Sequence, residues 1–122
     1  MIIGIGCDLI NIQRVARIII NSEYKIFERL YTSSEIKAAP RKTSCKYFSY
    51  FAKRFSAKES YAKATSNGIS EKVTFRSIEI LNTRNGAPYF NKHPLENQNI
   101  QAYLSMSDEF PYALSYVTLW QN

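Results

Sequence analysis

The pattern of apolar and polar positions predicts a helical first half that follows an initial strand. Residues 2–12 are mostly β-branched and are punctuated by glycine, which predicts a strand that is buried on both faces or that leads into a helix. Residues 15–29 carry apolar side chains at a loose helical spacing. Residues 32–38 open with a Thr-Ser-Ser-Glu run of the kind that caps a helix, so a second helix is expected there.

The clearest predicted element is a helix over residues 46–65. Aromatic side chains at Phe48, Phe51 and Phe55 recur at helical spacing among strong helix formers. Gly68 stands just beyond the segment, where a left-handed residue commonly ends a helix.

The second half of the chain predicts strands joined by short turns. Apolar positions predict strands over residues 73–82, 100–106 and 112–120, the first with one slip in its alternation. An Asn-Gly pair marks a turn within residues 83–88, and residues 107–111 form another turn. Helices early and strands late predict an α+β fold in which helices pack on a small antiparallel sheet.

Composition adds size, charge and compartment to this picture. A chain of 122 residues with 45% hydrophobic content predicts one globular domain over residues 1–122. Sixteen Lys and Arg against ten Asp and Glu favour anionic partners: phosphates, nucleic acid, membrane surfaces or acidic proteins. Cys7 and Cys45 lack metal-binding or redox spacing, which favours free thiols. Without a long apolar run or a basic leader, a cytoplasmic protein with no membrane span is expected.

Two acids stand where apolar side chains are expected. Asp8 lies within the first strand, and Glu59 projects from the apolar face of the long helix together with Phe55 and Ala62. For either acid alone, an ion pair with a nearby Lys or Arg is the simpler interpretation. If the strand packs on the helix, the pair predicts a Mg²⁺ site whose coordination is completed by a substrate phosphate.

Cations flank the second acid. Arg54 and Lys58 are four residues apart beside Glu59, and Lys63 follows one turn later. Ordinary solvated helix charges remain one interpretation of this pattern. The other is a combined phosphate and metal site.

Three segments together carry a resemblance to a known family. They are residues 4–10 (GIGCDLI), 51–59 (FAKRFSAKE) and 103–107 (YLSMS). In this order they resemble the holo-acyl-carrier-protein synthases, the small bacterial phosphopantetheinyl transferases. The resemblance covers essentially the whole chain.

The resemblance implies a phosphopantetheinyl transferase-like fold and a magnesium-dependent transfer of 4′-phosphopantetheine from coenzyme A to a serine of acyl carrier protein. Adenosine 3′,5′-bisphosphate is the expected second product, and the reaction would support fatty acid biosynthesis. A homotrimer with active sites at subunit boundaries is also implied. The implied residues are Asp8 and Glu59 for the metal; Asp8, Glu59 and Lys63 for catalysis; Arg54, Lys58, Lys63, Gly86, Pro88 and Ser107 for the coenzyme; and Arg14 for carrier docking.

Two alternatives stay open, one from departures from the family pattern and one from the basic composition. Asp108 stands where the family usually has His, Asn11 where an acid is common, and Ser77 where Asp is usual. An inactive transferase homologue is therefore one alternative. A basic nucleic-acid-binding module is another, although it leaves the buried acids unexplained because carboxylates repel a phosphate backbone.

Overall fold

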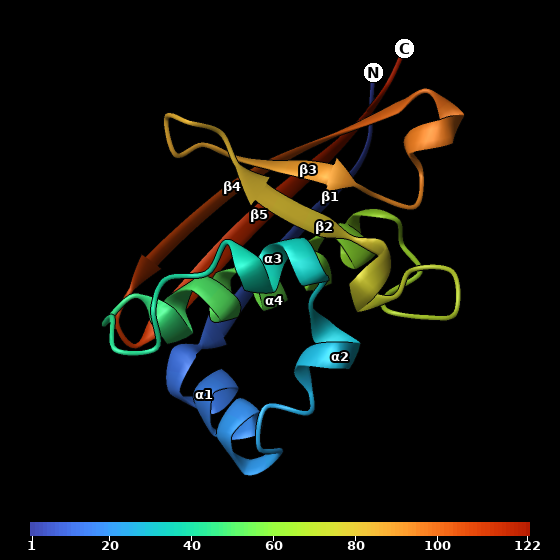
Figure 1. Cartoon of the computed structure of the whole chain (residues 1–122). Helices are drawn as coiled ribbons and strands as arrows, with labels where there is room; N and C mark the ends of the chain where they lie inside the picture. The colour runs from blue at the N-terminus through green and yellow to red at the C-terminus, as the bar shows by residue number, and fades with distance from the viewer.

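The computed structural model describes all residues, 1–122, and places two antiparallel sheets around one long helix (Figure 1). The strands are β1 (Ile2–Asn11), β2 (Glu79–Asn82), β3 (Pro88–Lys92), β4 (Ile100–Glu109) and β5 (Tyr112–Gln121). The helices are α1 (Ile12–Asn21), α2 (Phe27–Leu30), α3 (Ser33–Lys37) and α4 (Tyr47–Ala64), with short 3₁₀ helices at η1 (Phe75–Ser77) and η2 (Glu96–Gln98).

The larger sheet joins the two ends of the chain. Its strand order is β1-β5-β4, and β1 pairs antiparallel with β5 so that Asp8 lies opposite Ser115. The strands β2 and β3 form a separate two-stranded sheet. Helix α4 crosses one face of the larger sheet, and the predicted α+β architecture is confirmed (Figure 1).

Strand β1 passes directly into α1. The side chain of Asn11 accepts hydrogen bonds from the amides of Gln13 at 2.9 Å and Arg14 at 3.3 Å, which satisfies two free N–H groups of the first turn. The prediction of a strand leading into a helix is confirmed.

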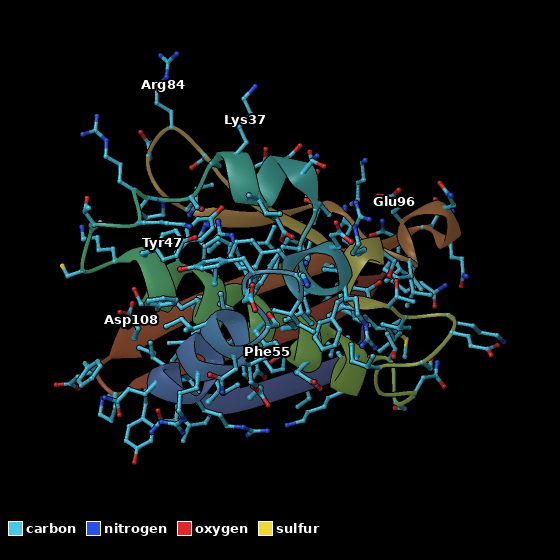
Figure 2. All side chains as sticks on the ribbon, turned by 60° about the horizontal axis from the view of Figure 1, so that its bottom comes forward. Lys37, Tyr47, Phe55, Arg84, Glu96 and Asp108 are labelled. Carbon is cyan, nitrogen blue, oxygen red and sulfur yellow. The ribbon has the colours of Figure 1, made fainter.

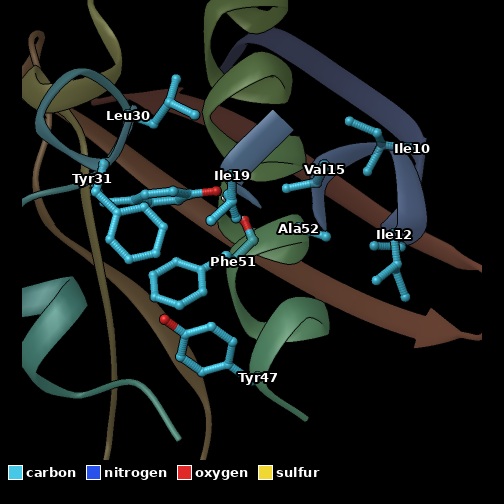
Figure 3. Packing of buried hydrophobic residues seen from close by; sticks show 11 residues of the cluster. Ile10, Ile12, Val15, Ile19, Leu30, Tyr31, Tyr47, Phe51 and Ala52 are labelled. Atoms are coloured by element: carbon cyan, nitrogen blue, oxygen red, sulfur yellow. Dashed lines mark hydrogen bonds between the residues drawn. The ribbon is translucent and has the colours of Figure 1, made fainter. Parts of the chain in front are cut away.

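Aromatic side chains fill the core between α4 and the short helices. Between centroids, the ring of Phe51 lies 4.5 Å from that of Phe27 and 4.8 Å from that of Tyr31. Figure 3 shows Phe51 and Tyr31 in this core. A second apolar cluster, which includes Tyr61 and Val117, lies between α4 and β5. Helix α4 therefore contributes to both halves of the core.

The outer face of the larger sheet is uncovered and apolar, so β1 is not buried on both faces. Leu9 is 63% exposed and Ile5 57% exposed on β1, with Tyr103 at 55% on β4 and Tyr116 at 45% on β5. We call these four residues, together with Ile3, Leu114 and Trp120, the outer sheet face.

The loose helical pattern over residues 15–29 does not correspond to one continuous helix. Helix α1 ends at Asn21, and Glu23 and Tyr24 then adopt positive φ angles of 53° and 67°, which turn the chain before α2. The amphipathic spacing continues through this break, so the sequence pattern conceals it.

The sheet boundaries also differ from prediction. Residues 73–82 hold η1 and then the short β2, and Thr74 and Ser77 cap η1 reciprocally. Strand β3 was not predicted, and β4 runs beyond residue 106 to Glu109, which leaves a shorter turn before β5. Cys7 and Cys45 are both free and exposed.

Candidate active site

Two glycines on β1 bring that strand against the backbone of α4. A Cβ atom built on Gly6 would lie 1.9 Å from the carbonyl oxygen of Ser60, and one built on Gly4 would lie 2.0 Å from that of Ala64. No other residue type fits at either position, because the neighbouring atoms belong to backbone. The strand and the helix therefore approach more closely than side chains between them would allow.

A buried cluster of three serines fixes the register of α4 on the sheet. The hydroxyls of Ser56 and Ser60 lie 2.7 Å and 2.6 Å from that of Ser115 on β5. Ser56 also donates to the backbone carbonyl of Asp8 at 3.0 Å. These bonds hold Asp8, which follows Gly6 on the inner face of β1, at a defined position along α4.

At that place the structure brings Asp8, Glu59 and Lys63 together. The Lys63 ammonium lies 3.3 Å from Asp8 Oδ1 and donates to the carbonyl of Cys7 at 3.0 Å. Partial burial, and then the neighbouring Asp8 carboxylate, raise the pKa of Glu59, while Lys63 and Arg14 act in the opposite direction. The two carboxylates are therefore close enough to repel each other.

The donor set of this acid pair fits a magnesium ion. Asp8 and Glu59 supply hard oxygen ligands from two different elements, and no third acid, histidine or cysteine joins them in a cluster. Mg²⁺ is commonly bound by one or two carboxylates, with waters and substrate phosphates as its other ligands. A cation would also oppose the burial and the repulsion from Asp8 that raise the pKa of Glu59.

Comparisons with known proteins identify the family of this chain. A model of the 4′-phosphopantetheinyl transferase superfamily matches residues 4–117. The chain belongs to this superfamily. The holo-[acyl-carrier-protein] synthase of Zymomonas mobilis is 37% identical to it over 131 residues, which cover 98% of this chain and 96% of that protein.

Solved structures of relatives share the fold of this superfamily member. The holo-[acyl-carrier-protein] synthase of Neisseria meningitidis is 37% identical, with a TM-score of 0.88 over 99% of this chain and 100% of that one. The synthase of Bacillus anthracis, solved in complex with CoA (3′,5′-ADP), is 31% identical, with a TM-score of 0.88 over 100% of this chain and 99% of that one. The family and the fold predicted from the sequence are confirmed.

Two cations predicted to contact coenzyme A in this transferase lie away from the acid pair. Lys58 is fully buried, and its ammonium donates to the carbonyl of Leu30 at 2.7 Å and to Glu35 Oε1 at 2.6 Å. Arg54 is 2% exposed; its guanidinium lies 3.6 Å from the Tyr50 ring centroid. The structure gives no support to direct phosphate contacts from either residue, because both are enclosed and already paired.

The remaining predicted coenzyme residues lie on the strands and their turns. Gly86, with a φ of 90°, lies in the turn between β2 and β3, and Pro88 begins β3. Ser107 is exposed on β4, beside Asp108, which pairs with Lys53 of α4 at 3.0 Å.

Sequence reasoning missed the parts that hold this site together. The sequence contains no pattern that marks the serine cluster, because serines at three separate positions are common in any chain. The glycines did have one: Gly4 and Gly6 alternate on one face of a strand, which is typical of a close backbone approach. Across the whole chain, the structure contains no helix long and apolar enough to cross a membrane.

Proposed function

We propose that this chain transfers 4′-phosphopantetheine from coenzyme A to a serine of acyl carrier protein with magnesium as cofactor. The observation that carries the proposal is the convergence of Asp8 and Glu59 beside Lys63 in a member of the superfamily. Relatives named holo-[acyl-carrier-protein] synthase over nearly the full length of this chain support the choice of acceptor.

In the proposed reaction the carrier serine hydroxyl attacks the β-phosphorus of coenzyme A. The bond from that phosphorus to the bridging oxygen breaks, and adenosine 3′,5′-bisphosphate leaves. Glu59, beside the reacting groups, accepts the proton of the serine hydroxyl. The Lys63 ammonium stabilises negative charge on the phosphoryl oxygens.

Asp8 and Glu59 would hold the magnesium ion. When bound there, it would act as a Lewis acid that neutralises charge on the pyrophosphate. Asp8 also orients Lys63 through their ion contact, which keeps the ammonium beside the reacting phosphate.

The carrier is expected to dock on a basic face along α1 and α2. Arg14, Arg17, Lys25 and Arg29 are all exposed there, and Arg14 is near enough to influence Glu59. Carrier proteins are acidic, so the encounter should weaken as salt rises. The alternative of a nucleic-acid-binding module accounts for the basic face but not for the paired carboxylates.

The coenzyme is expected to extend from the acid pair toward Gly86, Pro88 and Ser107. A relative solved with CoA (3′,5′-ADP) supports a nucleotide ligand for this fold. The outer sheet face supports assembly into the expected homotrimer, because an exposed apolar surface of this kind is typical of a subunit interface. Sites at subunit boundaries would let a neighbouring chain complete the coenzyme pocket.

The deciding experiment measures the intact mass of acyl carrier protein after incubation with coenzyme A, magnesium and this protein. A gain of one phosphopantetheine group is expected with the natural sequence and with Glu71→Gln, an exposed acid far along the chain from the pair. Asp8→Asn and Glu59→Gln should abolish the gain. Near-normal transfer by both acid variants at saturating magnesium would refute the site assignment.

The same assay tests the inactive alternative. Absence of transfer by the natural sequence, together with retarded migration of random nucleic acid in a gel, would favour the binding module instead.

A further inference from the structure

One side of α4 is directed away from the acid pair and toward β2. Tyr50, Arg54 and Lys58 are spaced four residues apart and therefore form a stripe along the helix. We infer that this stripe is a brace that positions the turn between β2 and β3, and that it thereby sets the affinity for the nucleotide end of coenzyme A. The inference rests on the proposed function, which assigns Gly86 and Pro88 to that end.

The first connection of the brace runs from Arg54 through Asn82 to the turn. The Arg54 guanidinium donates to Ile80 O at 3.3 Å and to Asn82 Oδ1 at 2.5 Å. The amide nitrogen of Asn82 then donates to the carbonyl of Gly86 at 2.9 Å. The side-chain oxygen of Asn82 thus binds the helix, and its side-chain nitrogen binds the turn.

The second connection runs from Lys58 through Glu35 to β2. Glu35 is fully buried and accepts from the Lys58 ammonium at 2.6 Å and from the amide of Ile80 at 2.9 Å. Tyr50 donates to the backbone carbonyl of Glu35 at 2.6 Å. Each residue of the stripe therefore reaches β2 directly or through one intermediate.

The turn is itself a closed unit. Thr83 donates through its amide to Ala87 O at 2.8 Å, and Ala87 donates back to the Thr83 hydroxyl at 3.1 Å. The amide of Gly86 donates to Thr83 O at 2.9 Å. Arg84 at its tip points away from the body of the molecule (Figure 2). A closed turn of this kind moves as one body, so its position depends on the tie made by Asn82.

The brace gives Arg54 and Lys58 a role without contact to phosphate. The acid pair and the brace occupy different sides of α4, so the helix holds the reacting groups and the nucleotide turn in one rigid relation. Loss of the brace should weaken coenzyme binding, while the chemistry at Glu59 and Lys63 continues. Arg54 and Lys58 are then positioning residues.

The test uses Asn82→Ala, because Asn82 is exposed and its truncation leaves the core intact. The KM for coenzyme A should rise about tenfold, the factor expected when a hydrogen bond to a charged group is lost. The kcat should stay within about twofold, since the acid pair is unchanged. Asn97→Ala, an exposed residue of η2, is the matched control and should leave both constants unaltered.

Hydrogen exchange of the free protein provides a readout of the turn itself. The amides of Gly86 and Ala87 should exchange faster in Asn82→Ala than in the natural sequence or in Asn97→Ala. Unchanged exchange together with an unchanged KM would overturn the inference.

A double-mutant cycle with Arg54→Lys separates positioning from direct contact. Lysine keeps the charge but cannot bond Ile80 and Asn82 together while stacking on Tyr50. If Arg54 acts through Asn82, the KM of the double variant for coenzyme A should lie within about twofold of the higher of the two single-variant KM values. If Arg54 contacts the phosphate itself, the two effects should multiply, and the inference fails.

Failure of the brace and failure of the proposed function give different results. Calorimetric titration with coenzyme A measures the same loss of affinity without turnover. Transfer of phosphopantetheine by the Asp8→Asn variant would contradict the proposed function. Normal coenzyme binding by Asn82→Ala would contradict only the brace.

Discussion

At the scale of single residues, the site depends on two glycines, which have no side chain to hold β1 away from α4. Gly4 and Gly6 allow β1 to touch the backbone of α4, and Asp8 comes beside Lys63 as a consequence. Asp8 and Glu59 could be selected from the sequence because each conflicts with its apolar surroundings. Their proximity could not, since it depends on how closely two distant elements pack.

Gly6→Ala should destabilise the protein and impair the site together. The added methyl would meet the Ser60 carbonyl at 1.9 Å, so β1 and α4 must separate. Overpacking of this kind costs about 1–3 kcal/mol, which thermal unfolding would detect. Cys7→Ala, whose side chain lies on the exposed face, should change the melting temperature little. An unaltered melting temperature for Gly6→Ala would contradict the close packing.

Lys63→Gln should reduce kcat and leave stability nearly unchanged. Loss of one preorganised charge at a reacting phosphate lowers kcat by about a hundredfold. The Lys63 side chain is 54% exposed, so its contribution to folding is small. Steady-state transfer and thermal unfolding measure the two effects. A large drop in melting temperature with unchanged kcat would place Lys63 in the fold instead of the site.

At the scale of elements, helix α4 is the part that the sequence predicted best. Its aromatic spacing gave its extent to within one residue at each end, because a long amphipathic pattern is hard to imitate by chance. The prediction failed for β3, which is short, and for residues 73–82, where a 3₁₀ turn interrupts the alternation. Short elements take their form from tertiary contacts rather than from propensity.

Removal of the shared hydroxyl of the serine cluster should loosen α4 on the sheet. Ser115→Ala removes the hydroxyl contacts with Ser56 and Ser60, which keep their bonds to backbone carbonyls, so we expect a cost of about 0.5–1.5 kcal/mol per lost hydrogen bond. Ser105→Ala on the exposed face of β4 is the matched control and should be nearly neutral. Denaturant unfolding measures both variants; equal midpoints would show that the cluster contributes nothing.

The brace should make stability depend on pH above neutrality. Burial, and to a smaller extent the neighbouring Arg54, lower the pKa of Lys58 from 10.5 to about 8, despite attraction from Glu35 and Glu79. Between about pH 8 and 10 the unfolded chain keeps a proton that the folded chain has released. The free energy of unfolding should therefore rise with pH across this window. Below it, Lys58 is protonated in both states and should cause no change with pH.

Urea unfolding at intervals of pH tests this dependence. Tyr61, whose pKa is raised to about 12, acts with the opposite sign above about pH 10, so the window ends there. The double variant Glu35→Gln/Lys58→Met should lose the rise. A rise that persists in that variant would assign it to another group.

At the scale of the whole molecule, the outer sheet face is the largest feature that one chain leaves unexplained. Its apolar side chains come from β1, β4 and β5 and are exposed to solvent in the single chain. For residues 2–12 the sequence pattern favoured a strand that is buried on both faces or that leads into a helix, and the outer face of β1 would be buried only if another copy of the chain covers it. The apolar pattern of β1 indicated burial on both faces, and packing within one chain buries only the inner face, against α4.

Leu9→Glu/Tyr116→Glu should convert an oligomer into a monomer. Both side chains lie on the outer sheet face, and charges there oppose its burial. Light scattering after size exclusion measures the mass, and circular dichroism checks that the fold is retained. The natural sequence should give the mass of three chains. A natural sequence that is monomeric at micromolar concentration would contradict the proposed trimer.

The sequence by itself determined the fold class, the extent of α4 and the two unusual acids, because hydrophobic periodicity and a charge at an apolar position can be recognised from local residue order, and the resemblance of three segments indicated the family. Only the tertiary structure decided that Arg54 and Lys58 face β2 and that Glu59 and Lys63 face β1. All four lie on one helix within ten residues, so spacing alone left their roles open. Their separation arises because different elements pack on different sides of that helix.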